Sequence, residues 1–148
     1  MSDSQRETVE RNYWTYIDGL DQSSTIQRFA RFVNVHDAFV GPVTREDNIL
    51  RLRLLTGDLQ VGYWQTDLTY RNATISYGEA ALFQAARRPR TEVWYDEFSS
   101  NGSQWIHRFL LWPRFLTAKK GKKVRGEFHI KFDEMNFNQV PLNGREFE

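Results

Sequence analysis

The sequence contains no cysteine in its 148 residues, which excludes disulfide bonds, thiolate metal sites and cysteine nucleophiles. It has no apolar run near the ~20 residues that a membrane-spanning helix needs. The segment SDSQRETVER after Met1 also lacks the apolar core of a signal peptide. The sequence also has no excess of charge of either sign, because it contains 20 Lys and Arg and 19 Asp and Glu. The resulting net charge of +1 gives no general attraction to nucleic acid or to an anionic membrane. We therefore expect a soluble, cytoplasmic protein that contacts no membrane and for which nucleic acid is not the expected partner.

The patterns of several known sites are absent as well. The glycines at 57, 62 and 78 form neither the dinucleotide-binding nor the Walker spacing. No serine stands in the GxSxG context of a hydrolase nucleophile. The three histidines, His36, His107 and His129, show no HxH or HxxxH spacing that would hold a metal. We therefore expect no metal site and no cofactor.

Aromatic residues are abundant, with 11 Phe, 6 Tyr and 5 Trp in a chain that is 40% apolar. That content is enough for a hydrophobic core and argues against intrinsic disorder. A chain of this length can hide about 70% of the surface that it exposes when unfolded, so it needs no metal or disulfide to fold. Residues 1–148 are therefore expected to form a single domain.

Three segments have the pattern of helices. Capping-box spacing at Ser4 and again at Ser24, each followed by apolar residues on one helical face, predicts helices over 4–19 and 24–33. The strong helix formers after Gly78 predict a third helix over 78–86, which Pro89 ends.

The remaining segments favour strands. Residues 35–40 form a short apolar run that Gly41-Pro42 ends, whereas 45–55 suits a strand as well as a helix. Aromatic and β-branched residues predict strand structure over 59–75. Clearer strands follow at the ranges 91–98, 104–112 and 124–132, with a hairpin loop around Asn101-Gly102. A last short strand is placed near 137–142. Helices first and an antiparallel meander later indicate an α+β fold, with N-terminal helices packed on a curved antiparallel sheet.

The order of these elements resembles a known family, and five stretches carry the resemblance: RNYWTYIDGLD, IQRFARF, AFVGP, DLTYRNATISYGEAAL and RFLTAKKGKKVRGEFHIKF. Their helix, Gly-Pro and Gly-Lys patterns are similar to the SnoaL-like branch of the nuclear-transport-factor-two superfamily. The resemblance implies a cone-shaped α+β barrel, and either 4–41 or 45–75 is its helix-and-first-strand unit. A lipocalin-like barrel or another α+β sandwich is the alternative fold.

The resemblance also implies a pocket between the sheet and the helices, in which such proteins bind small hydrophobic molecules. On its strand His107 shares a face with Trp105 and Phe109, and Asp96 shares one with Trp94. Pairing across the 99–103 loop would bring Asp96 close to His107, where the carboxylate could orient the imidazole. His107 is therefore the candidate proton carrier and Asp96 its partner, while the alternatives are a core histidine and a solvated aspartate.

Aromatic side chains are the candidates for contacting a ligand, with the tyrosines donating hydrogen bonds to a carbonyl oxygen. The candidate ligand-binding residues are Tyr13, Tyr16, Tyr70, Trp94, Trp105 and Phe109. The function implied is cofactor-independent acid–base chemistry on a hydrophobic metabolite, namely cyclisation, isomerisation, dehydration or hydrolysis. The alternative is a non-catalytic ligand-binding or accessory subunit of the same fold, and in either case a homodimer is expected.

Other polar residues have simpler interpretations. His36-Asp37 suits a loop or turn, and His129 lies on the polar face of its strand, where solvent reaches it. The cluster of Lys and Arg over 114–125 could contact phosphates, but the balanced net charge and the Gly121 turn favour a solvated loop that deters association.

Overall fold

The computed structural model describes residues 3–20, 24–58, 62–88, 90–117 and 119–142. The chain divides into two compact units, residues 1–33 and 34–148, and each is described by itself. Leu59, where a predicted strand segment begins, and Pro89, the predicted end of the third helix, lie outside the described residues.

The first unit contains two helices, α1 (Asp3–Asp18) and α2 (Thr25–Phe32), in agreement with the predicted ranges. The Arg31 Nε–H of α2 donates to Asp18 Oδ1 of α1 over 2.7 Å. The same guanidinium lies 4.4 Å from the centre of the Trp14 ring. At Ser24 the backbone begins the helix without a side-chain cap, so the predicted capping box does not form there. None of the described helices is both long enough and apolar enough to cross a membrane.

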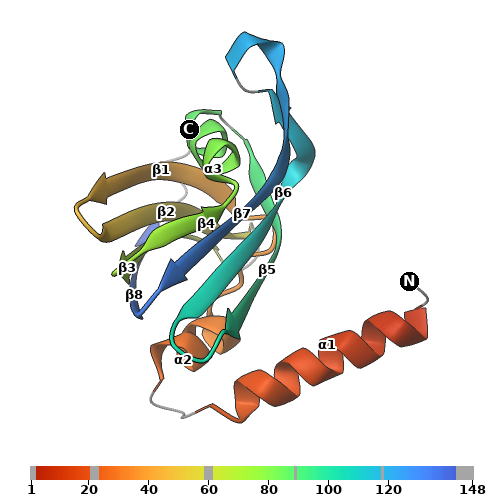
Figure 1. Ribbon diagram of the computed structural model, residues 1–148. Coiled ribbons are helices and arrows are strands. Elements are labelled where there is room, and N and C mark those ends of the chain that lie inside the picture. Colours follow the sequence, from red (N-terminus) through yellow and green to blue (C-terminus); the bar gives the residue numbers. More distant parts are fainter. Residues whose placement is uncertain (1–2, 21–23, 59–61, 89, 118, 143–148) are drawn as a thin grey trace. The chain divides into compact units, whose positions relative to one another are not determined.

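The second unit is built on an antiparallel sheet. In chain order its described elements are β1 (Phe39–Glu46), β2 (Ile49–Asp58), β3 (Gly62–Arg71), β4 (Thr74–Tyr77), α3 (Glu79–Arg87), β5 (Glu92–Ser100), β6 (Trp105–Thr117), the short helix η1 (Lys119–Gly121), β7 (Lys123–Phe132) and β8 (Glu134–Leu142). Neighbours in the sheet follow the order β4-β7-β6-β5-β1-β2-β3-β8, with every pair antiparallel, and the sheet is not closed. The α+β class and the antiparallel sheet are thus confirmed (Figure 1).

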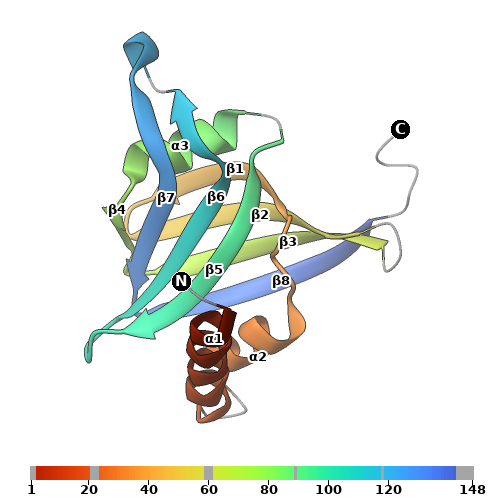
Figure 2. The same ribbon diagram turned by 90° about the vertical axis from the view of Figure 1, so that its right-hand side faces the viewer.

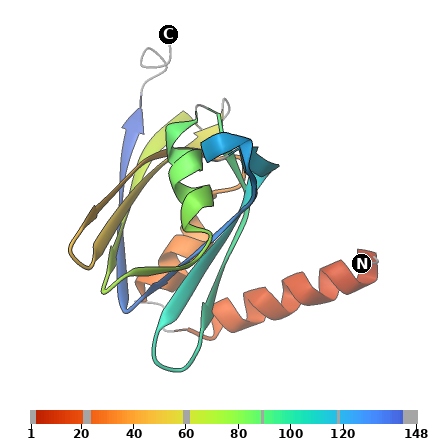
Figure 3. The same cartoon turned by 45° about the horizontal axis from the view of Figure 1, so that its top comes forward.

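The sheet curls so that strands distant in its order face each other. Tyr70 on β3 lies 5.1 Å from Phe132 on β7, measured between ring centres, although four strands separate β3 from β7 in the sheet. Figure 2 shows β1, β2, β3 and β8 crossing behind β5, β6 and β7. Helix α3 packs against β1, β7 and β6 at one end of the sheet (Figure 3). Five buried aromatic rings gather on the inner face, those of Tyr70, Phe98, Phe109, Phe128 and Phe132.

Two strands differ from the predicted boundaries near the start of the second unit. The strand predicted over 35–40 begins only at Phe39 and continues through Gly41-Pro42 to Glu46, so the prediction that Gly-Pro ends it is wrong. A register shift between Val40 and Val43 explains this, because a proline at a bulge need not donate to the ladder. The ambiguous stretch 45–55 is strand, divided between β1 and β2.

Two glycines are required by close backbone contacts. Gly78 precedes α3 at φ 76°, and a Cβ on it would lie 1.9 Å from the carbonyl oxygen of Glu127. At Gly126 a Cβ would lie 2.7 Å from the carbonyl oxygen of Pro113. Gly126 faces the irregular part of β6, where four residues separate two consecutive pairings with β7. The predicted helix after Gly78 and the hairpin of β6 with β7 therefore both depend on a missing side chain.

Candidate functional site

Three polar side chains from different strands form a hydrogen-bonded chain inside the second unit. His107 on β6 is fully buried. Its Nε2 lies 2.7 Å from Asp96 Oδ2 on β5, and its Nδ1 lies 2.7 Å from Tyr70 Oη on β3. The predicted proximity of Asp96 and His107 is confirmed. We refer to Tyr70, His107 and Asp96 as the interior triad.

The direction of these hydrogen bonds follows from the groups themselves. A carboxylate only accepts, so the Nε2–H of His107 donates to Asp96. The other ring nitrogen, Nδ1, is then the acceptor of a neutral imidazole, and the phenol O–H of Tyr70 donates to it. Every polar atom named in the interior triad is thereby paired, as burial requires.

Aromatic rings enclose the imidazole. The ring centre of Phe98 lies 3.9 Å from that of His107 in a stacked arrangement, and Phe109 lies 4.1 Å away. Burial lowers the pKa of His107, although the hydrogen bond and the negative charge of Asp96 act in the opposite direction. The imidazole is therefore held in its neutral form more strongly than in water.

The phenol at the other end of the interior triad is also perturbed. Burial raises the pKa of Tyr70 well above its ordinary value, and the charge of Asp96 raises it further. Tyr70 therefore remains a neutral hydrogen-bond donor throughout the physiological pH range. Asp96, with its side chain 20% exposed, is the member of the interior triad that solvent reaches.

The neighbouring predicted residues do not all face the interior. Phe109 is fully buried beside His107, and Trp105 is half-buried on the same strand. Trp94 is 49% exposed because the register shifts between Val93 and Tyr95, which makes Trp94 an extra residue in β5. The alternation that placed Trp94 on the face of Asp96 therefore breaks at this bulge.

The predicted tyrosines fall in different parts of the chain. Tyr70 belongs to the interior triad. Its contact with His107 could not be predicted from the sequence, because only the curl of the sheet brings β3 and β6 together. Tyr13 and Tyr16 lie on α1, in the first compact unit. The ring of Tyr13 meets that of Trp14 edge-on at 5.4 Å.

A second polar cluster, which the sequence did not reveal, lies on the outer face of β5, β6 and β7. Glu127 is only 6% exposed. The Nε2 of His129 lies 2.7 Å from Glu127 Oε2, and Arg108 bridges Glu127 and Glu97 at 3.3 and 3.0 Å. Burial alone would raise the pKa of Glu127, but the hydrogen bonds from His129 and Arg108, with the charges of Arg108 and Arg125, lower it. His129 is therefore bound to a carboxylate and half-buried, whereas the sequence predicted a solvated side chain.

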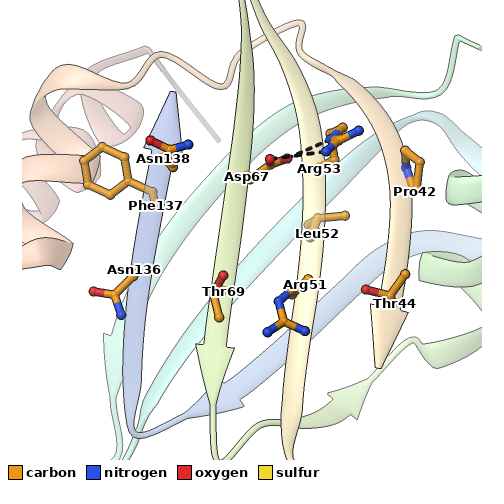
Figure 4. Close-up of a pocket in the computed structure, with 10 residues that line it drawn as sticks. All are labelled: Pro42, Thr44, Arg51, Leu52, Arg53, Asp67, Thr69, Asn136, Phe137 and Asn138. Atoms are coloured by element: carbon orange, nitrogen blue, oxygen red, sulfur yellow. Dashed lines mark hydrogen bonds and ion pairs between the residues drawn. The ribbon is translucent and has the colours of Figure 1, made fainter. Parts of the chain in front are cut away.

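A hollow of about 460 Å³ lies on the outer face of β1, β2, β3 and β8 (Figure 4). Most of its lining side chains are polar, and Arg53 donates to both carboxylate oxygens of Asp67 over 2.8 and 3.3 Å. The lining residues are Pro42, Thr44, Arg51, Leu52, Arg53, Asp67, Thr69, Asn136, Phe137 and Asn138. This hollow is separate from the interior triad.

The three histidines lie in three different surroundings. His36 occupies the predicted turn, where its Nδ1–H donates to the carbonyl oxygen of Trp94 over 2.6 Å. His107 lies inside the sheet, and His129 lies on the outer face. Among the described residues, no three His, Asp or Glu side chains gather in an arrangement suited to a metal ion.

Comparison of the chain with protein-family models, with curated proteins and with solved structures finds no match.

Proposed function

We propose that the protein is a cofactor-independent acid–base catalyst acting on a small hydrophobic molecule, with Asp96 as the group that exchanges a proton. The observation that carries this function is the hydrogen-bonded interior triad, which runs from a partly exposed carboxylate to a fully buried phenol. Candidate reactions are those in which a proton leaves one atom of the molecule and returns to another, such as isomerisation, cyclisation or dehydration.

The interior triad suits Asp96 to the role of base. One carboxylate oxygen, Oδ2, accepts from His107, so the other oxygen can take a proton from a bound molecule. Both nitrogens of His107 are already bonded and its ring is fully buried, so we assign it as a positioning residue that fixes Asp96. Tyr70 in turn fixes the tautomer of His107. The sequence suggested the reverse, with His107 as proton carrier.

The SnoaL-like resemblance and its cone-shaped barrel belong to the same proposal. A curled antiparallel sheet with a polar chain on a mainly aromatic inner face supports them. A homodimer is the assembly we propose, and the exposed Trp94 side chain, 49% accessible, favours a covering partner. Light scattering after size-exclusion chromatography tests the dimer. The cytoplasmic location remains a prediction from the sequence.

A non-catalytic ligand-binding or accessory protein is the second candidate, and one observation favours it. The imidazole of His107 is stacked on Phe98 and lies against Phe109, so aromatic rings occupy the space around it. In that case the interior triad would stabilise the fold, and substitutions would change stability and ligand affinity alone.

The two candidate functions predict different rates of proton exchange on a hydrophobic carbon acid, because only a catalyst should accelerate this exchange. We would incubate the purified protein with aryl ketones such as 1-indanone in D2O and follow loss of the α-proton signal by NMR. The wild type should exchange faster than buffer, and Asp96→Asn should lower the enzymatic rate by about 100-fold or more, because a positioned base contributes on the order of 10²–10⁴.

Glu97→Gln is the matched control, since it makes the same chemical change one residue along, on the opposite face of β5. It should keep the wild-type exchange rate. Equal rates for wild type and Asp96→Asn across the ketone panel would exclude Asp96 as the base. Native mass spectrometry for a co-purified small molecule then tests the binding role.

A further inference from the structure

The end of the β6–β7 hairpin combines charge of one sign with unusual exposure. In the sequence, residues 112–126 contain Lys or Arg at six positions and no Asp or Glu. The hairpin end extends beyond the neighbouring strands in two views (Figures 1 and 2). The described basic side chains there are exposed, and they are Arg114, Lys120, Lys122, Lys123 and Arg125.

A second basic segment joins this hairpin. Helix α3 ends at Arg87, Arg88 caps it, and Arg90 follows in the sequence. The Arg88 Nη2–H donates to the carbonyl oxygen of Thr117 on β6 over 3.0 Å. Arg88 and Thr117 are 29 residues apart in the sequence, so this contact brings the two basic segments onto one surface. We call Arg87, Arg88 and Arg90, together with the described residues 112–117 and 119–125, the basic surface.

Charge is therefore distributed unevenly over the molecule. Nine of the 20 Lys and Arg residues fall within the basic surface, so the remaining 11 are outnumbered by the 19 Asp and Glu residues of the whole chain. A near-neutral net charge hides this separation, which is why composition alone argued against an anionic partner. Local positive potential, and not the net charge, determines where a polyanion contacts a protein.

Two large aromatic side chains are exposed beside these charges. Phe115 is 61% exposed and Trp112 is 54% exposed. Phe115 is paired across the hairpin with Arg125, whose side chain is 61% exposed. Cross-strand neighbours stand about 5 Å apart, so a ring and a guanidinium are presented together. The Arg125 guanidinium also lies 3.3 Å from Glu127 Oε1 and is still largely exposed, so its solvent-facing side can contact a phosphate.

We propose that the basic surface binds single-stranded nucleic acid, with Lys and Arg contacting phosphates and the rings of Phe115 and Trp112 stacking on unpaired bases. Proteins that bind single strands without sequence preference combine positively charged side chains along the phosphate backbone with exposed aromatic rings on which bases stack. A duplex keeps its bases stacked and offers the rings no face. An anionic bilayer fits less well, because the hairpin end at 119–123 consists of lysines and one glycine, and the rings lie farther back on β6.

The test is fluorescence anisotropy with labelled 20-nucleotide poly(dT) and poly(U) at increasing NaCl concentrations, using the full chain. Binding should be in the micromolar range at about 50 mM NaCl and weaken steeply with salt. Lys120→Glu with Lys122→Glu should weaken binding at least about tenfold and reduce the salt slope by about 1.4, since each phosphate contact contributes roughly 0.7 on single strands. Phe115→Ala should weaken binding about fivefold or more without changing the slope.

Arg11→Glu with Arg28→Glu is the matched control, because it makes the same change in net charge at exposed positions of α1 and α2. Its binding should stay within about threefold of the wild type, and circular dichroism confirms that each variant is folded. A duplex of mixed sequence and phosphatidylserine vesicles complete the comparison, and both should bind more weakly than the single strands.

Three results would overturn the assignment. The first is no anisotropy change at 20 mM NaCl. The second is an equal loss of affinity in the hairpin and control variants, which would show attraction without a site. The third is equal or tighter binding to duplex or vesicles than to single strands.

Discussion

Replacing Tyr70 with phenylalanine removes one hydroxyl from the interior and leaves the ring in place. That hydroxyl donates to His107 Nδ1 over 2.7 Å, and both residues are fully buried. Water cannot take its place, so the ring nitrogen loses its donor and bears the cost of an unsatisfied buried acceptor, about 1–3 kcal/mol. With a urea m-value of about 2 kcal/mol/M, the unfolding midpoint should fall by roughly 0.5–1.5 M. Tyr77→Phe is the control, because Tyr77 is 46% exposed, and it should change stability by less than about 0.5 kcal/mol.

A double-mutant cycle separates the hydrogen bond from the loss of packing. His107→Leu alone leaves the Tyr70 hydroxyl without its acceptor and should cost a similar amount. When both partners become apolar, the second change should cost less, giving a coupling of about 0.5–3 kcal/mol between the two sites. Urea denaturation at pH 7.5 measures all four proteins. Additive losses within about 0.3 kcal/mol, or a Tyr70→Phe variant as stable as the wild type, would refute the hydrogen bond.

Two further predictions concern pH and backbone shape. The pKa of His107 is lower in the folded protein than in the unfolded chain, so the unfolded chain takes up a proton first as the pH falls. The free energy of unfolding should therefore decrease below about pH 6.5, by up to about 1.36 kcal/mol per pH unit. Urea midpoints between pH 5 and 7.5 measure this, and an unchanged dependence of stability on pH in His107→Leu would assign the effect to another group. Gly78→Ala should destabilise by more than about 2 kcal/mol, because its Cβ would overlap the Glu127 carbonyl oxygen at a positive φ. Gly102→Ala, also at positive φ but with open space around it, should lose only about 1–2 kcal/mol, and thermal melts that rank the two in reverse would contradict the contact.

The sequence predicted local structure where one pattern dominated. Strong helix formers after Gly78 located α3, and alternation together with the Asn101-Gly102 loop located the β5–β6 hairpin. The same hairpin register brought Asp96 next to His107, because inward-facing residues near a turn are neighbours by geometry. Contacts between residues that lie close together in the sequence could therefore be predicted from the sequence.

Other features depend on distant segments and could not be read in that way. Tyr70 reaches His107 only because the sheet curls, and no local pattern encodes the amount of curl. Glu127 stands in a polar alternating position, yet Arg108 and His129 surround it and bury it. The bulge at Trp94 shifts the alternation of inward- and outward-facing side chains along β5 by one residue. No sequence pattern in this aromatic strand indicates the extra residue.

The most direct measurement is the nitrogen-15 NMR spectrum of the imidazole of His107 between pH 5 and 8, with the signals assigned by their loss in His107→Leu. A neutral ring protonated at Nε2, persisting below pH 6.5, is expected when Tyr70 donates to Nδ1 and Asp96 accepts. A ring that is doubly protonated at pH 7, or protonated at Nδ1 alone, would contradict the interior triad and with it the role of Asp96 as a base.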